Sequence, residues 1–67
     1  MRFFYLQRID DLYWLTLTDG KRNFPLVPEG YQNEDNAVTH LSVHGACLAV
    51  QKYNRMHSTN YMIKTHL

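Results

Sequence analysis

Three residues with metal-binding side chains, His40, His44 and Cys47, have the spacing that one helix would bring to a single face. Positions i, i+4 and i+7 fall within about 60° of one another on a helix. Imidazole and thiolate are zinc ligands, but a tetrahedral site needs a fourth group. His57 or His66 would have to fold back to supply it, or water would fill the position. Two histidines at positions i and i+4 of a helix are frequent by chance, so we expect no metal and no other cofactor.

Cys47 is also the only candidate for a thiol nucleophile, with His44 close to it on the same expected helix. Nucleophilic catalysis needs an orienting acid as well, and every acid of the chain lies within residues 1–35. Ala46 and Leu48 flank the cysteine, as is typical of a small buried hydrophobic residue. The sequence therefore predicts a protein that is not an enzyme.

Alternating residues predict strands at 3–9, 12–18, 21–27 and 61–67. The segment 12–18 is rich in aromatic and β-branched residues, which favour strands. Depending on which face packs on a helix, either Tyr13 or Trp14 of this segment points outward. A chain this short has no second layer for the other face, so large aromatic side chains should be exposed there.

Turn signals separate these strands. Asp10-Asp11 is expected to form a tight turn, and Asp19-Gly20 a two-residue hairpin loop of type I′, because glycine takes positive φ without strain. Pro25 cannot donate a hydrogen bond to a neighbouring strand, so the strand at 21–27 should lie at an edge of the sheet.

A long helix is expected after a loop at residues 28–32, with Asn33 as its N-cap. Gly45 either allows close approach to the sheet or marks a break that leaves two shorter helices. The fold prediction is an α+β protein with a three- to four-stranded antiparallel sheet, of order β-β-β-α-β, covered on one face by this helix. Its buried stripe would consist of Ala37, Val38, Leu41, Gly45, Leu48, Ala49 and Tyr53.

Length and composition place this chain among small globular proteins. The 67 residues are enough for one domain, 1–67, and the single cysteine excludes an internal disulfide. Hydrophobic residues make up 45% of the chain, yet no run is long enough for a signal peptide or a membrane span. We therefore expect a cytoplasmic protein.

The two halves of the chain carry opposite charges. All acids lie in residues 1–35, whereas residues 36–67 contain Lys52, Arg55, Lys64 and the four histidines, and no acid. Acidic side chains suit a protein that imitates DNA, and basic ones suit an acidic partner. The acidic candidates are Asp10, Asp11, Asp19, Glu29, Glu34 and Asp35, and the basic candidates are Lys21, Arg22, Lys52 and Arg55. Tyr13 and Trp14 are the candidate aromatic contacts.

The segment from 12 to 55 has a strand with Trp14, an Asp-Gly-Lys-Arg turn at 19–22, then Phe24 and a helix. In layout it resembles the sheet-plus-helix DNA-binding domains of phage integrases and plant ethylene-response factors, although no diagnostic motif matches. The resemblance implies a sheet that enters the major groove of DNA, which is the alternative function for this chain.

In its small size, its aromatic content and its lack of a set of catalytic residues, the chain also resembles the small proteins that phages make to bind and block a host complex. Anti-CRISPR proteins are one class of these. No residue can be transferred from that class, because its members share no motif. The resemblance implies a non-enzymatic inhibitor that binds a host protein or nucleoprotein complex. The exposed aromatic face also admits a homodimer, and no membrane partner is expected.

Overall fold

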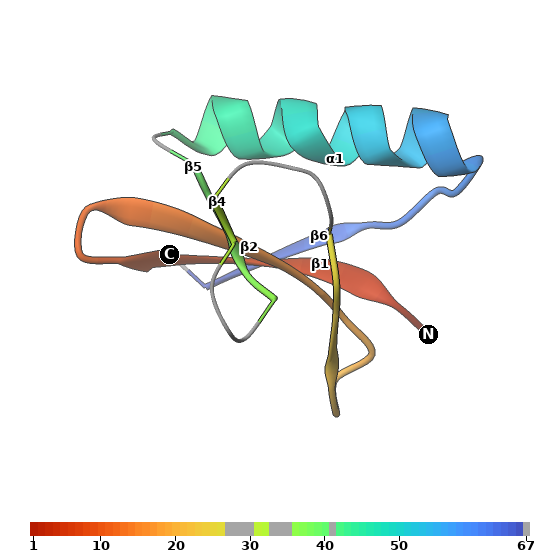
Figure 1. The fold of residues 1–67 in the computed structure, drawn as a ribbon, viewed down its shortest axis with the longest axis horizontal. Coiled ribbons are helices and arrows are strands. Elements are labelled where there is room, and N and C mark those ends of the chain that lie inside the picture. The colour runs from red at the N-terminus through yellow and green to blue at the C-terminus, as the bar shows by residue number, and fades with distance from the viewer. Residues whose placement is uncertain (27–30, 33–35, 41, 67) are drawn as a thin grey trace.

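The computed structural model describes residues 1–26, 31–32, 36–40 and 42–66. Its elements are β1 (Phe3–Ile9), β2 (Leu12–Thr18), β3 (Asn23–Phe24), β4 (Tyr31–Gln32), β5 (Val38–His40), α1 (Val43–His57) and β6 (Ile63–His66). The helix α1 lies across one face of a sheet of order β4-β5-β2-β1-β6, and β3 also pairs with β2 (Figure 1). The chain is thus an α+β protein, which confirms the predicted fold class.

The hairpin of β1 and β2 forms the centre of the sheet. Its turn consists of Asp10 and Asp11 alone, with φ angles of 52° and 65°. Aspartate tolerates the left-handed region better than most residues, and two such residues in succession make the turn that suits the twist of a hairpin. This confirms the predicted turn, and it sets Leu6 opposite Leu15 and Phe4 opposite Leu17.

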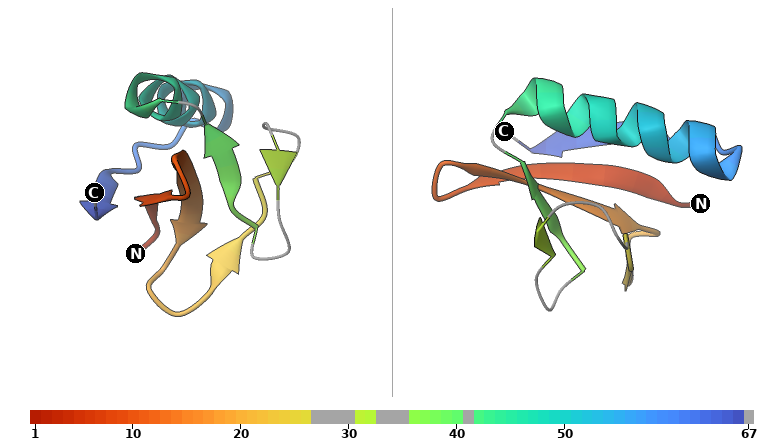
Figure 2. Two further views of the ribbon diagram at one scale, coloured as in Figure 1. Left: turned by 90° about the vertical axis from the view of Figure 1, so that its left-hand side faces the viewer. Right: turned by 45° about the horizontal axis from the view of Figure 1, so that its top comes forward.

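The hydrophobic core lies between this hairpin and α1. Phe4, Leu6, Leu15 and Leu17 are each at most 2% exposed, and they pack with the buried Ala46 and Val50 of the helix, Val38 of β5 and Leu26. Removing one such leucine or phenylalanine side chain from water contributes roughly 1.5–3 kcal/mol. The other face of β1 and β2 has no covering layer within the described part of the chain (Figure 2).

The second hairpin differs from the prediction of a two-residue turn at Asp19-Gly20 and a strand at 21–27. Thr18 pairs with Asn23, so the loop holds residues 19–22, and β3 ends at Phe24, directly before Pro25. The Asp19 carboxylate accepts hydrogen bonds from two backbone N–H groups of this loop, which favours the longer turn. The expected edge position of this segment is confirmed, since β3 pairs with β2 alone.

The predicted start of the helix is wrong. Asn33 lies outside the described residues, but Val38–His40 form β5, which pairs antiparallel with Tyr13–Leu15 of β2. The N-cap is Ser42, which has an extended backbone and whose side-chain oxygen accepts the N–H of Gly45 at 3.0 Å. The β-branched Val38 and Thr39 favour the strand, and Val38 gains a buried place opposite Leu15.

The helix runs unbroken through Gly45, so the alternative of two shorter helices is also wrong. A Cβ atom at Gly45 would stand 3.3 Å from the Ser42 Oγ, which places this glycine against the cap and not against the sheet. The core-facing residues are Ala46, Ala49, Val50 and Tyr53, whereas the predicted stripe residue Leu48 is 49% exposed. Leu41 of that stripe lies outside the described residues.

The final strand returns to the sheet, as predicted, but it lies parallel to β1, so the sheet is not purely antiparallel. Asn54 of α1 holds the connection, because its Oδ1 accepts from the Tyr61 N–H at 3.1 Å and its Nδ2 donates to the Tyr61 carbonyl at 3.2 Å. Tyr61 in turn lies edge-on to Phe4, with 6.0 Å between ring centroids. The end of the helix thereby fixes where β6 begins.

The cap at Ser42 gives a direct test of the helix start. We expect Ser42→Ala to lower the free energy of unfolding by about 1 kcal/mol, because the Gly45 N–H loses its side-chain acceptor. Ser42→Asp should retain most of the wild-type stability, because aspartate is also a good N-cap. Urea unfolding followed by circular dichroism measures both. Equal stability of wild type and Ser42→Ala would contradict a helix that begins at Val43.

Candidate functional site

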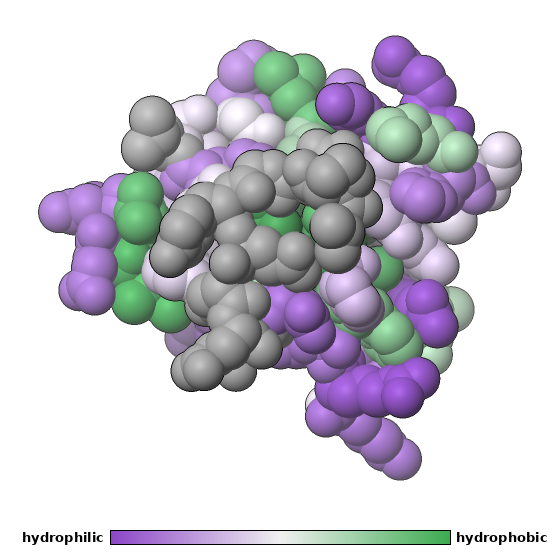
Figure 3. Space-filling model, viewed as in Figure 1, coloured by the Kyte–Doolittle hydropathy of each residue, from purple (hydrophilic) through white to green (hydrophobic). Residues whose placement is uncertain are grey.

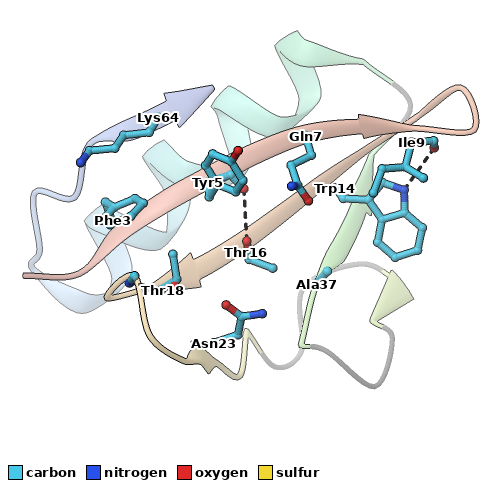
Figure 4. Close-up of a pocket in the computed structure, with 11 residues that line it drawn as sticks. Phe3, Tyr5, Gln7, Ile9, Trp14, Thr16, Thr18, Asn23, Ala37 and Lys64 are labelled. Carbon is cyan, nitrogen blue, oxygen red and sulfur yellow. Dashed lines mark hydrogen bonds between the residues drawn. The ribbon is translucent and has the colours of Figure 1, made fainter. Parts of the chain in front are cut away.

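A groove lies on the open face of the sheet, opposite α1. Alternate side chains of β1 and β2 line it, with Phe3, Tyr5 and Gln7 from one strand and Trp14 and Thr16 from the other (Figure 4). Its volume is about 680 Å³, which is within the usual range of ligand-binding pockets. The remaining lining residues are Ile9, Thr18, Gly20, Asn23, Ala37 and Lys64.

Backbone pairing and side-chain hydrogen bonds hold the floor of the groove. Tyr5 lies directly opposite Thr16, whose hydroxyl donates to the Tyr5 carbonyl at 3.3 Å. Trp14 lies opposite Gln7, and its indole N–H donates to the Ile9 carbonyl at 3.2 Å. The indole ring therefore has a fixed position at one end of the groove, while the half-buried phenol ring of Tyr5 lies near the middle.

Lys64 of the edge strand β6 lies at the opposite end. Its ammonium nitrogen stands 4.3 Å from the centroid of the Phe3 ring, a cation–π contact. The parallel pairing sets Lys64 beside Tyr5 of β1. A positive charge thus stands over the aromatic floor of the groove.

Two further cations meet at Phe24, which pairs with the buried Leu17 and packs against the hydrophobic core, not in the groove. The Arg2 guanidinium carbon is 3.8 Å and that of Arg22 4.7 Å from the centroid of the Phe24 ring. Stacking on one ring orients both guanidinium groups and leaves their N–H edges available to a carboxylate or phosphate. Of the cations named so far, Lys64 lines the groove, whereas Arg2 and Arg22 stack on a ring of the core face.

The loop at 19–22, of which Gly20 lines the groove, is held by hydrogen bonds to Asp19. The Asp19 carboxylate accepts the N–H groups of Lys21 and Arg22 at 2.9 and 3.1 Å. These two hydrogen bonds, with a smaller contribution from the Arg22 charge, hold the pKa of Asp19 below its ordinary value of 3.8. The Thr18 hydroxyl closes the loop by donating to the Arg22 carbonyl at 2.8 Å.

The two aromatic residues predicted to bind a partner lie on opposite faces. Trp14 lines the groove, whereas Tyr13 packs against the core beneath the helix, with the Arg8 guanidinium carbon 5.9 Å above its ring. The sequence left open which of them faces outward, and the structure selects Trp14.

The predicted charged residues fall into three places. Asp10 and Asp11 lie at the β1–β2 turn, where Arg8 pairs with Asp11 at 3.3 Å; both side chains are largely exposed, so the pair adds little stability. Asp19, Lys21 and Arg22 lie in the loop at 19–22, of which only Gly20 lines the groove, and Lys52 and Arg55 lie on α1. Glu29, Glu34 and Asp35 fall outside the described residues.

The candidate metal-ligand pattern required His40, His44 and Cys47 to lie on one face of one helix, and this arrangement is wrong. His40 belongs to strand β5, whereas His44 and Cys47 belong to α1. Within the described part of the chain, no group of three or more metal-binding side chains comes together. The half-buried Cys47 is a free thiol.

Sequence reasoning missed Phe3, Tyr5, Gln7 and Lys64 as site residues. The alternation in β1 correctly placed the first three on one face, but the sequence did not show which face the helix covers. Lys64 reaches the groove only because β6 pairs in parallel with β1, and no local pattern encodes that pairing.

The chain is thus a small α+β protein. One helix covers one face of its sheet, and a groove lined by aromatic side chains and Lys64 lies on the other face. Comparisons with protein-family models, with curated proteins and with solved structures found no match for this chain. Among the described residues, no helix has the length and apolar character needed to cross a membrane.

The lowered pKa of Asp19 predicts how the loop responds to acid. A carboxyl with a lowered pKa adds stability above its ordinary value of 3.8 and loses that contribution as the pH falls through the lower folded value. We expect carbon-detected NMR to give a titration midpoint below 3.8 for Asp19, with the amide signals of Lys21 and Arg22 shifting in the same range. Those amide shifts should vanish in Asp19→Asn. A midpoint at or above 3.8 would contradict the two hydrogen bonds.

Proposed function

We propose that this protein is a non-enzymatic inhibitor that acts in the cytoplasm by covering a surface of a host protein or nucleoprotein complex, as small phage proteins of the anti-CRISPR type do. Its binding site is the groove on the open sheet face. One observation carries this proposal: aromatic side chains line a recess of about 680 Å³ on the face that α1 leaves uncovered.

The chemistry of the lining supports binding. The groove presents aromatic rings, the amides of Gln7 and Asn23, threonine hydroxyls and the ammonium of Lys64. Aromatic rings supply most of the free energy at protein interfaces, and amides and hydroxyls fix the orientation of what is bound. Such groups hold a partner by stacking and hydrogen bonding.

The ends of the groove differ in charge, which suits a partner with an oriented surface. Ile9 and Trp14 lie at the end near the Asp10–Asp11 turn, where Figure 3 shows hydrophobic atoms framed by hydrophilic ones at the left. Ile9 is 45% exposed there. The opposite end carries the ammonium of Lys64 over the Phe3 ring. Complementary charges guide a partner into one orientation and raise the rate of association.

Nucleic-acid binding is the second candidate, because cationic side chains stack on aromatic rings of the sheet: Lys64 on Phe3, and Arg2 and Arg22 on Phe24. The Asp19 carboxylate, in the loop that carries Arg22, is engaged by two backbone N–H groups. Phosphate groups would find cations and aromatic rings together.

A capture experiment with matched variants tests the groove as the binding site. A tagged wild-type protein should retain a defined host partner, and Tyr5→Val should retain at least about tenfold less, since central aromatic residues dominate interface energies. Valine preserves the strand propensity that alanine would lower. The control is Leu48→Gln on the exposed side of α1, which should retain the partner. Equal capture by both variants, or loss only with Leu48→Gln, would contradict the proposal.

A further inference from the structure

The outer edge of β6 offers unpaired backbone groups at the border of the groove. Within the described part of the chain, β6 is the last strand in the sheet order and pairs with β1 alone. We infer that this edge pairs with an extended segment of the partner protein, in which an acidic residue lies between apolar ones. This inference rests on the proposed function, because it names the part of the partner that binds on the Lys64 side of the groove.

A hydrogen bond at the start of β6 fixes the direction of its backbone groups. The Phe4 N–H donates to the Met62 carbonyl at 2.8 Å. Successive residues of a strand direct these groups to opposite sides, so those of Met62 and Lys64 turn toward β1. The N–H and C=O groups of Ile63 and Thr65 turn outward, where no strand of the described chain pairs with them (Figure 2). Two donors and two acceptors thus have the spacing that another polypeptide strand completes.

The backbone of β6 is open to the addition of a strand. Its four residues pair with β1 in one continuous register, without a bulge, and residues 62–66 contain no proline. A lysine on an edge strand usually deters pairing. Lys64, however, leans inward, with its ammonium 4.3 Å from the centroid of the Phe3 ring. The edge is therefore accessible, and the charge lies beside it on the groove face.

Lys64 determines which side chain fits opposite it. Within the described part of the chain, no carboxylate forms a salt bridge with this lysine; the recorded pair is Arg8 with Asp11. A residue of the added strand directly opposite Lys64 would place its Cβ about 4.5–5.5 Å from the lysine Cβ. An ammonium has three N–H donors, so it can bind a carboxylate there while it stays over the Phe3 ring. An acidic residue is attracted to this position, and a basic one is repelled.

The neighbours of that acidic residue face the side of the sheet that α1 covers. Ile63 is half-buried and packs against the hydrophobic core, and the exposed Thr65 lies two residues along the same strand. Apolar β-branched residues opposite these two would extend the core, because such cross-strand pairs stabilise a sheet. The edge therefore fits a segment of the pattern apolar–acidic–apolar.

A second copy of this chain fits the same edge poorly. Antiparallel pairing of two β6 strands through both outward residues sets Ile63 opposite Thr65 of the other copy. The same register sets the two Lys64 side chains opposite each other, and like charges in that position destabilise a strand pair. The edge thus disfavours self-association and favours an acidic strand of another protein.

The test uses the intact protein and a blocked five-residue peptide, threonine-valine-glutamate-valine-threonine, titrated into the ¹⁵N-labelled protein and followed by NMR. We expect antiparallel pairing, which is the more stable arrangement. The amide signals of Ile63 and Thr65 should shift, and their hydrogen exchange should slow, because both N–H groups gain acceptors. A peptide with lysine in place of glutamate should bind roughly 2- to 30-fold more weakly, and Lys64→Glu should reverse this preference.

Methylated peptides separate backbone pairing from other contacts. In the antiparallel arrangement the valine N–H groups face β6, whereas the glutamate N–H points away. Methylation of both valine nitrogens should weaken binding about tenfold or more, and methylation of the glutamate nitrogen should change it by about twofold at most. In the protein, Thr65→Pro removes one outward N–H and should also weaken binding about tenfold, whereas Thr65→Val should not. Circular dichroism confirms the fold of each variant.

Three results would overturn the inference: no shift of the Ile63 and Thr65 signals at millimolar peptide, binding that valine methylation leaves unchanged, or equal affinity for the glutamate and lysine peptides. A dimer held together by β6 would also overturn it and assign the edge to a second copy. If capture of a host partner depends on Tyr5 but survives Thr65→Pro, the proposed function stands and this inference fails. If the peptide binds as expected but no host partner is captured, the edge pairing stands and the proposed function fails.

Discussion

The pairing of β1 with β2 decides on which face every side chain of the central hairpin lies. Successive residues of a strand point to opposite faces, so a shift of one residue would bring Tyr5 under the helix and expose Phe4 and Leu6. The two-residue turn at Asp10–Asp11 prevents such a shift. It sets Ile9 opposite Leu12, and this pair fixes every later pair along the two strands. The hydrophobic core and the aromatic groove are therefore two results of the same register.

The other elements build the walls of the groove around this hairpin. The outer edge of β2 is shared, since β5 pairs with Tyr13–Leu15 and β3 with Leu17 and Thr18. This division places Asn23 and Ala37 along one side of the recess. On the other side, the side chain of Asn54 fixes the start of the chain that leads to β6, which sets Lys64 beside the floor. Contacts in the core layer thus determine the position of a charge on the opposite face.

Local signals were sufficient for β1, β2 and their turn, where alternation and turn residues agree. Local signals failed for Val38–His40. The apolar residues 37, 38 and 41 fit the periodicity of a helix as well as they fit a short strand that ends at a turn. The pairing of Val38 with Leu15, distant in sequence, decided between the two. The groove was predictable only in outline: an open aromatic face followed from the short chain, but the choice of Trp14 over Tyr13 required knowing which face α1 covers.

The contact of Lys64 with Phe3 explains how an aromatic face can stay open in so small a protein. In the free protein the ammonium lies over the ring at 4.3 Å and partly shields it from water. A ligand that brings both an anion and a flat apolar group gives the ammonium and the ring each a new partner, whereas a purely apolar ligand would displace the ammonium without compensation. A purely anionic ligand would draw the ammonium away and leave the ring to water. The contact therefore selects for ligands in which both properties occur side by side.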